Sequence, residues 1–493
     1  MTAALTSAEK ATTTHLPFSR IIGYGFGDAG CNIAFQMTGL FLLVFYTDVV
    51  GIRPEHSGAI FLFIKIWDAF ADIFAGRMVD RTMTRWGKFR PFLLWYAVPL
   101  LASNLRCFWA PFDDYWKKVG WAAATYALMG LLYSLVNIPY GSLAGAMSQD
   151  PVDRSRMASA RMVGSGFTIL VLSLFLAPAI KSANNLQHTF LVTSVAFFVV
   201  GSIFFAITFF TSKEVVYREV EKVSLRDTIE TVKNNGPLVR LCGSSLFYLT
   251  GQNVVSAMGA YLGIDMLGRL SDGNWLTSAI MVITTGAVLY TGPFGPMVTR
   301  HLGKRNGFAV ASAVAAAGLL IFWIGNSLLA NLWVGLLGLF ITGASMAVLN
   351  TMTWALEADT VEYGELKTGI RTEGATYAAF SFTRKVGQGV GMAIASWTLA
   401  LASYDQAAGH AGQSSDTINS MGLWFAVFAG ACFLGAGLIM LTYPLTEEKF
   451  QEIMQAINSR RQQGQTISGR ADGGHPENAL GTELAGNTTT PAP

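Results

Sequence analysis

The feature that most constrains this chain is a run of about 20 apolar residues that recurs along most of its length. A helix of that length crosses the roughly 30 Å of hydrocarbon in a bilayer. Only 13% of the 493 residues are charged, about half of the share in soluble domains. Backbone polar groups must be paired in lipid, and these runs are too long and too evenly apolar for barrel strands. The sequence therefore predicts an all-α membrane protein with about twelve transmembrane helices, near 22–47, 57–79, 91–110, 119–147, 162–180, 189–211, 239–263, 276–298, 307–326, 331–355, 374–402 and 421–443.

A polar stretch at 211–237 divides these segments into two sets of six. Each set carries a related basic loop in the corresponding place: GRMVDRTMTRWGKFR (76–90) follows the second segment, and GPMVTRHLGKR (295–305) follows the eighth. Repeated halves of this kind are typical of transporters, whose substrate sites form at the interface of the repeats. We expect an N-terminal segment, a six-helix half, a central loop, a second six-helix half and a largely disordered tail, at 1–20, 21–211, 212–237, 238–445 and 446–493.

Arginine and lysine collect in the loops that follow even-numbered segments, and this sets the expected orientation. These loops, the central stretch and both termini are predicted to be cytoplasmic. No basic patch with interleaved aromatic residues suggests a nucleic-acid partner. The basic residues concerned are Arg77, Arg81, Arg85, Lys88 and Arg90, then Arg154 and Arg156, then Arg300, Lys304 and Arg305, then Lys367 and Arg371.

The second segment contains two aspartates, Asp68 and Asp72, with Lys65 just before them. Each charge inside a bilayer costs roughly 2.5 to 3.5 kcal/mol on insertion scales, so it needs a reason to be there. The two aspartates are one helical turn apart and share a face. Two carboxylates in a partly dry site cannot both ionise cheaply, so the pair can hold a proton or a cation. The alternative is a salt bridge of one carboxylate to Lys65, or to an arginine elsewhere, that serves packing alone.

Four further charged residues in or at the edge of predicted membrane segments are candidates for the site. Asp28 enters the first segment within GYGFGDAGCN, and Arg161 opens the fifth, where a snorkelling cation is the alternative interpretation. Arg384 and Lys385 lie about half-way along the eleventh, where a lysine needs a carboxylate partner or an anionic ligand. In the fourth segment, the proline of Asn-Ile-Pro-Tyr at 137–140 is expected to break the helix where it lines a cavity.

No constellation in the sequence points to catalysis or to a bound cofactor. The four cysteines lie in apolar segments without CxxC spacing, which predicts buried thiols rather than a disulfide framework or a zinc site. No nucleophile–base pair is recognisable, so we expect the protein not to be an enzyme. A sugar-sensing receptor or a lipid-modifying enzyme on the same fold is the alternative to a transporter.

Several motifs together resemble the glycoside–pentoside–hexuronide:cation symporters of the major facilitator superfamily. They are GYGFGDAG, FYTDVVG, IWDAFADIFAGRMVDRTMTRWGKFRP, YSLVNIPYGSLAGAM, EADTVEYGELKTGIRTEG and FSFTRKVGQGVG. The resemblance covers residues 20 to 460 and implies alternating access, with a sugar and a cation moving together. It also implies that Asp68 and Asp72 form the cation-coupling site, and that the substrate site includes Asp28, Asn137, Arg161, Arg384 and Lys385.

Two departures from the sodium-coupled members of the family suggest the transported ion and the substrate. Asn137 stands where those members have an aspartate, and Gly141 stands where they have a tryptophan. The lost carboxylate weakens a sodium cage but leaves a pair of aspartates for a proton, and the lost tryptophan makes room for a bulky aglycone. We expect a monomeric, proton-coupled importer of β-glucuronides in a bacterial inner membrane. The alternative is a sodium- or proton-coupled carrier of neutral glycosides such as xylosides or galactosides.

Overall fold

The computed structural model describes most of the chain, and the helices found in it are long. The described residues are 16–148, 151–181, 183, 185–215, 233, 235–270, 275–291, 295–368, 373–405 and 412–462. Nearly all of the N-terminal segment, most of the central loop and the tail beyond 462 therefore lie outside the described residues. Within the described residues there is no β-strand, and one isolated bridge joins Thr84 to Gly87.

The first half of the chain crosses the bundle six times. The helices are α2 (Phe18–Val44, continued by η1, Phe45–Val49), α3 (Pro54–Arg81), α4 (Arg90–Cys107), α5 (Tyr115–Met147), α6 (Pro151–Val171, continued by η2, Leu172–Leu176, and α7, Ala177–Lys181) and α8 (Leu186–Thr211).

The second half of the chain crosses six times as well, so the all-α architecture of two six-helix halves is confirmed. Its crossings are α10 (Gly236–Ala257, continued by α11, Gly259–Tyr261, and η3, Leu262–Met266), α12 (Trp275–Thr284, continued by η5, Thr285–Ala287, and α13, Val288–Thr291), α14 (Gly295–Trp323, continued by η7, Ile324–Leu328), α15 (Leu332–Thr368), α16 (Glu373–Leu401) and α17 (Ser415–Leu441). The helix α18 (Glu447–Gln462) follows.

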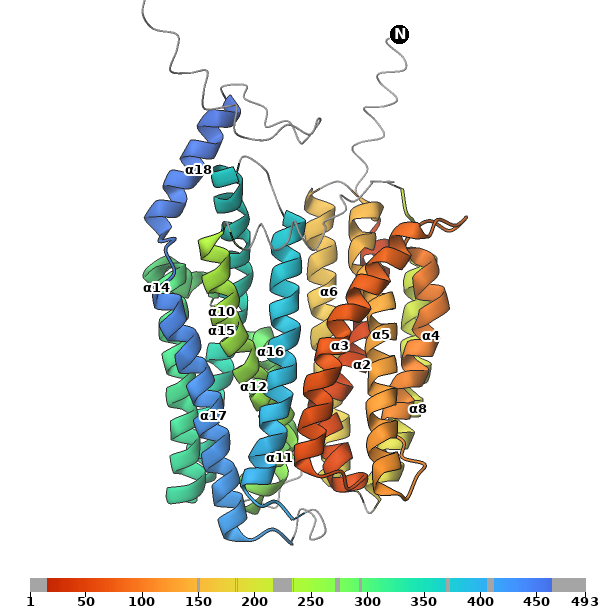
Figure 1. Cartoon of the computed structure of the whole chain (residues 1–493), viewed down its shortest axis with the longest axis vertical. Helices are drawn as coiled ribbons and strands as arrows, with labels where there is room; N and C mark the ends of the chain where they lie inside the picture. The colour runs from red at the N-terminus through yellow and green to blue at the C-terminus, as the bar shows by residue number, and fades with distance from the viewer. Residues whose placement is uncertain are drawn as a thin grey trace, which may run out of the picture.

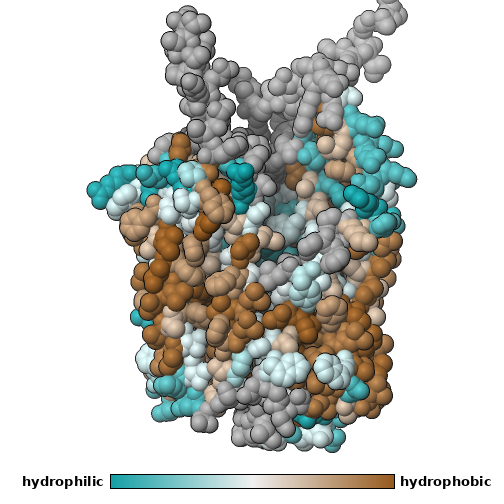
Figure 2. All heavy atoms as spheres, turned by 180° about the vertical axis from the view of Figure 1, so that it is seen from behind, coloured by the Kyte–Doolittle hydropathy of each residue, from teal (hydrophilic) through white to brown (hydrophobic). Residues whose placement is uncertain are grey.

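The two halves stand side by side, with α3 and α16 meeting between them (Figure 1). Seven of the described helices are long and apolar enough to cross a membrane by length and composition. Neither α3 nor α16 is among the seven, because both carry several charges. The flanks of the molecule are largely apolar, and polar residues gather toward its ends and in a recess between the halves (Figure 2). This distribution is typical of a bundle surrounded by lipid.

Contacts between the halves gather toward the end of the molecule opposite α18. There the Ser396 hydroxyl donates to the carbonyl of Pro54, and the hydroxyls of Thr47 and Tyr261 are 2.5 Å apart. Nearer the middle, the Tyr126 hydroxyl contacts the sulfur of Met392 at 3.9 Å. Toward the α18 end, α3 and α16 diverge (Figure 1). The halves therefore approach closely at one end of the molecule and separate toward the other.

Two expectations about helix boundaries are wrong. Pro139 does not break the fourth crossing, because α5 runs without interruption from Tyr115 to Met147. The stretch EADTVEYGELKT, expected to be a loop, forms the last turns of α15, which ends at Thr368. Its acidic residues are accommodated inside the helix by neighbours that the sequence pattern does not reveal: Asp359, for example, accepts two hydrogen bonds from Lys304, at 2.8 and 2.7 Å.

The glycines of the two repeated Gly-Lys pairs share an unusual backbone conformation. Gly87 has φ = 109° and Gly303 has φ = 73°, a region that L side chains rarely adopt. At Gly87 the backbone turns around the carboxylate of Glu214, which accepts the amides of Lys88, Phe89 and Arg90 at 2.8, 2.8 and 2.9 Å. A carboxylate at the start of α4 compensates the partial positive charge of that helix end.

Candidate functional site

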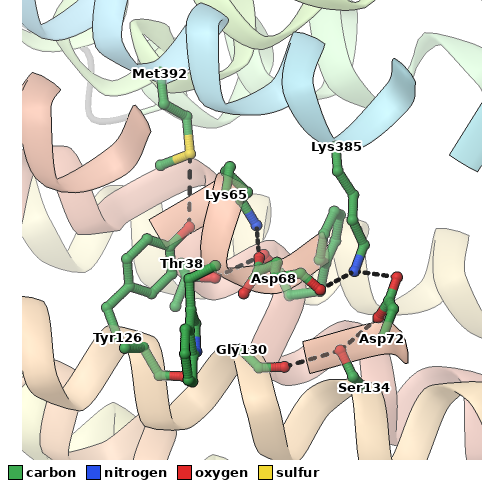
Figure 3. Close-up of polar contacts among 12 residues, drawn as sticks. Thr38, Lys65, Asp68, Asp72, Tyr126, Gly130, Ser134, Lys385 and Met392 are labelled. Carbon is green, nitrogen blue, oxygen red and sulfur yellow. Dashed lines mark hydrogen bonds and ion pairs between the residues drawn. The ribbon is translucent and has the colours of Figure 1, made fainter. Parts of the chain in front are cut away.

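Asp68 and Asp72 lie near the middle of α3 and face both α5 and α16, but each carboxylate has its own cationic partner (Figure 3). The ammonium of Lys65 lies 3.0 Å from Oδ2 of Asp68. Lys385 of α16 forms an ion pair with Asp72, whose Oδ1 accepts a hydrogen bond of 2.6 Å from the Ser134 hydroxyl. In this conformation the aspartates therefore form two separate ion pairs.

The pair of Lys65 and Asp68 is enclosed by the protein. The two side chains are 10% and 6% exposed, and the Lys65 ammonium lies 5.8 Å and 5.6 Å from the ring centroids of Phe35 and Tyr126. Oδ1 of Asp68 is buried and has no hydrogen-bond partner among the described residues. It fits because residue 130 is a glycine: a Cβ there would lie 1.9 Å from this oxygen.

Lys385 joins the two halves of the molecule. Besides its ion pair with Asp72, its ammonium donates to the backbone carbonyl of Asp68 at 3.1 Å (Figure 3). This pair is more accessible than the enclosed one, because its side chains are 19% and 28% exposed. Loss of the charge on either residue would therefore remove an ionic contact between α3 and α16.

Asp28 and Arg161 form a third ion pair, within the first half. The Nε atom of Arg161 donates to Oδ1 of Asp28 at 3.0 Å, and Asn32 donates to Oδ2 at 2.9 Å. The guanidinium lies 5.1 Å from the ring centroid of Tyr140. Arg161 does not open a helix, as was expected, because α6 begins ten residues earlier at Pro151. The contact of Arg161 with a buried aspartate favours a role in the interior over snorkelling at the membrane boundary.

Arg384 contrasts with the other interior cations. Its guanidinium lies 5.2 Å from the ring centroid of Trp354 on α15, and no carboxylate of the described residues forms an ion pair with it. Glu357 lies one turn beyond Trp354, is 7% exposed, and is within electrostatic range of Arg384. On the first half, Tyr133 lies within range of Arg384, Arg161 and Asp28. Arg384 thus lies near the boundary between the halves, and no hydrogen bond joins its guanidinium to another of the described residues.

Among the predicted site residues, Asn137 and Arg384 take part in none of the ion pairs described above. Asn137 is half-buried on α5 and makes no side-chain hydrogen bond within the described part of the chain. Sequence reasoning missed Gly130, Ser134, Trp354 and Glu357. The signal available for Glu357 was an acidic residue in a stretch matched to the family motif. Nothing in the sequence marks Gly130, because its importance depends on an oxygen atom 62 residues away in the chain.

A bundle of two six-helix halves, with an ion pair across their interface, is the architecture expected of a transporter of the major facilitator type. The fold agrees with a crystal structure of the peptide transporter POT in complex with sulfate, at a TM-score of 0.61 and 12% identity over 90% of this chain and 98% of that one. Residues 23–447 match the family model described as MFS/sugar transport protein, so the chain belongs to this family of membrane transporters.

Curated relatives agree with this membership. A protein of Escherichia coli (strain K12) described as a glucuronide carrier protein homolog is 38% identical over 92% of this chain and 98% of its own length. The isoprimeverose transporter of Lactiplantibacillus pentosus is 30% identical over 82% of this chain and 84% of its own length. These similarities confirm the expected membership of the glycoside–pentoside–hexuronide:cation symporters. The chain is a multi-pass sugar transport protein rather than an enzyme.

Proposed function

We propose that this protein is a proton-coupled symporter that imports β-glucuronides or similar acidic glycosides by alternating access. The observation that carries the proposal is Arg384, an interior guanidinium without an ion-pair partner among the described residues, beside the exposed face of Trp354. A guanidinium binds a carboxylate with two parallel hydrogen bonds, and a charge in a membrane protein interior needs such a partner. A uronate carboxylate would supply it, and the aromatic face would pack against the sugar or its aglycone.

The likeness to the glucuronide carrier protein homolog supports this substrate class. Asp28 and Arg161 would bind sugar hydroxyls from the first half, since both can accept or donate further hydrogen bonds. The isoprimeverose transporter supports the alternative, a carrier of neutral glycosides. Asn137 and the exposed Gly141 on α5, where nothing lies within 4 Å of an added Cβ, would leave room for an aglycone.

The pair of Asp72 and Lys385 is the part of the site suited to proton coupling. Water can reach Asp72 more readily than Asp68, because their side chains are 28% and 6% exposed. A proton on Asp72 would neutralise the carboxylate that holds Lys385, and so weaken the contact between α3 and α16. A sodium ion would instead need several oxygen ligands, while both aspartates are already paired with ammonium groups.

The basic loops favour a cytoplasmic location for the end that carries α18. On that orientation the halves are close together at the extracellular end and apart at the cytoplasmic end, which corresponds to an inward-facing carrier. The bacterial relatives favour the cytoplasmic membrane, which is the inner membrane in a species such as Escherichia coli.

Uptake of radiolabelled phenyl β-D-glucuronide into proteoliposomes tests the proposal. We expect accumulation with an inward proton gradient at zero sodium, and competition by methyl β-D-glucuronide that exceeds competition by methyl β-D-xyloside. Arg384→Gln is expected to abolish the preference for the uronate while it retains uptake of a neutral glycoside. Accumulation that requires sodium would refute proton coupling, and stronger competition by the xyloside would refute the substrate class.

A further inference from the structure

Glu357 is a buried acidic residue that the proposed coupling scheme does not use. It lies on α15, three residues after Trp354, so both side chains lie on the helix face that approaches Arg384 of α16. Arg384 is the cation that acts on its carboxylate, although the two groups do not form an ion pair. Glu357 therefore lies close to the Arg384 guanidinium, which is proposed to bind the substrate carboxylate.

Among the described residues, no cation other than Arg384 is found to act on its carboxylate. On α10, Cys242 lies within electrostatic range of Glu357. On α14, Lys304 forms an ion pair with Asp359, two residues further along α15, with Nζ to Oδ2 at 2.7 Å. Without substrate, the positive charge of Arg384 balances the negative charge of Glu357. When an acidic glycoside binds, two carboxylates compete for one guanidinium in a site of low polarity, and one of them then favours its protonated form.

We propose that Glu357 is a second proton site, which takes up one proton when a carboxylate-bearing substrate binds to Arg384. The proton comes from water in the cavity and adds to the Glu357 carboxylate, so the positive charge gained equals the negative charge that the substrate brings. The substrate carboxylate stays ionised on the guanidinium. The proton leaves Glu357 with the substrate on the other side of the membrane.

This inference rests on the proposed function and extends it. The Asp72 proton would travel with any substrate, whereas the Glu357 proton would travel only with an acidic one. A glucuronide would thus move with two protons and its neutral ester with one, and the net charge translocated would be the same for both. Glu357 would make transport of an anion electrically equivalent to transport of a neutral sugar.

A matched pair of ligands isolates the second proton. Methyl β-D-glucuronide and its methyl ester, which carries no charge, are added to the purified full-length protein in weakly buffered detergent solution with a pH indicator. We expect the acid to cause uptake of about one more proton per ligand bound than the ester does. The affinity for the acid should also fall about tenfold per pH unit between the pKa values of Glu357 in the free and in the ligand-bound protein, the slope for one linked proton.

Variants then identify the residue that takes up the additional proton. In Glu357→Gln the difference between acid and ester should disappear, whereas in the control Glu362→Gln, on the same helix, and in Asp72→Asn it should remain. Infrared difference spectra of the unmodified protein provide a measurement that does not depend on any variant: the acid should produce a protonated-carboxyl band in addition to any that the ester produces, recognised by its shift in D₂O, which the ester carbonyl of the ligand does not show.

The outcomes separate the two proposals. Equal proton uptake with acid and ester by the unmodified protein, or no carboxyl band with the acid beyond those seen with the ester, would overturn the role of Glu357. A difference that persists in Glu357→Gln would place the proton elsewhere and overturn it as well. Binding of neither ligand to the unmodified protein would instead count against the proposed function itself.

Discussion

Replacement of Gly130 by alanine tests whether the tight enclosure of Asp68 matters. The added Cβ would lie 1.9 Å from Oδ1 and 3.0 Å from Cγ of Asp68. Carbon and oxygen ordinarily approach to about 3.3–3.6 Å, so the oxygen must move by about 1.5 Å. Its partner oxygen is held by Lys65 at 3.0 Å, and a shift of that size breaks this bond.

The magnitude follows from the enclosure of the pair. Breaking a buried ion pair costs about 3–5 kcal/mol, and the change from glycine to alanine in a helix returns about 1 kcal/mol. We therefore expect a net destabilisation of about 2–4 kcal/mol from these two contributions. The assay is thermal unfolding in detergent, together with proton-driven accumulation of phenyl β-D-glucuronide in proteoliposomes.

The matched control is Gly145→Ala, on the same helix. Nothing lies within 4 Å of a Cβ at Gly145, so this variant should unfold at or slightly above the temperature of the unmodified protein. Gly130→Ala should unfold at a clearly lower temperature and lose accumulation. If both variants unfold together and both accumulate substrate, Oδ1 of Asp68 is not confined as the structure indicates, and the reasoning is wrong.

Three further changes have defined outcomes. Gly87→Ala combines a φ of 109° with a Cβ 2.4 Å from the Glu214 carboxyl carbon, so it should lower the unfolding temperature more than Glu214→Gln does. Ser134→Ala removes the 2.6 Å hydrogen bond to Asp72, and should shift the pH profile of uptake while the maximal rate stays within a few-fold. Tyr261→Phe removes hydrogen bonds to the other half, and should increase labelling of a cysteine introduced into the cavity from the side opposite α18; unchanged labelling would contradict a role in closure.

The membrane class, the all-α fold, the two halves and the interior charges were predictable from the sequence. Hydropathy and the cost of placing a charge in lipid depend on a residue and its neighbours in the chain, so a single sequence is enough to locate them. The same local reasoning placed Asp68, Asp72 and Lys385 within the membrane segments. It failed at Pro139, which α5 accommodates without a break, and at the end of α15, where a tertiary contact from Lys304 compensates the charge of Asp359.

Only the tertiary structure determined which charges pair across the two halves. Lys65 and Asp68 are three residues apart on α3, so their pairing was open to sequence reasoning, whereas the close packing of α3 and α16 selects Lys385 as the partner of Asp72. In the described part of the chain, the packing of the helices also leaves Arg384 without a carboxylate in an ion pair. It places Glu357 within electrostatic range of Arg384. Coulomb energies depend on distances between atoms that are remote in sequence. Those distances exist only once the two halves have packed together.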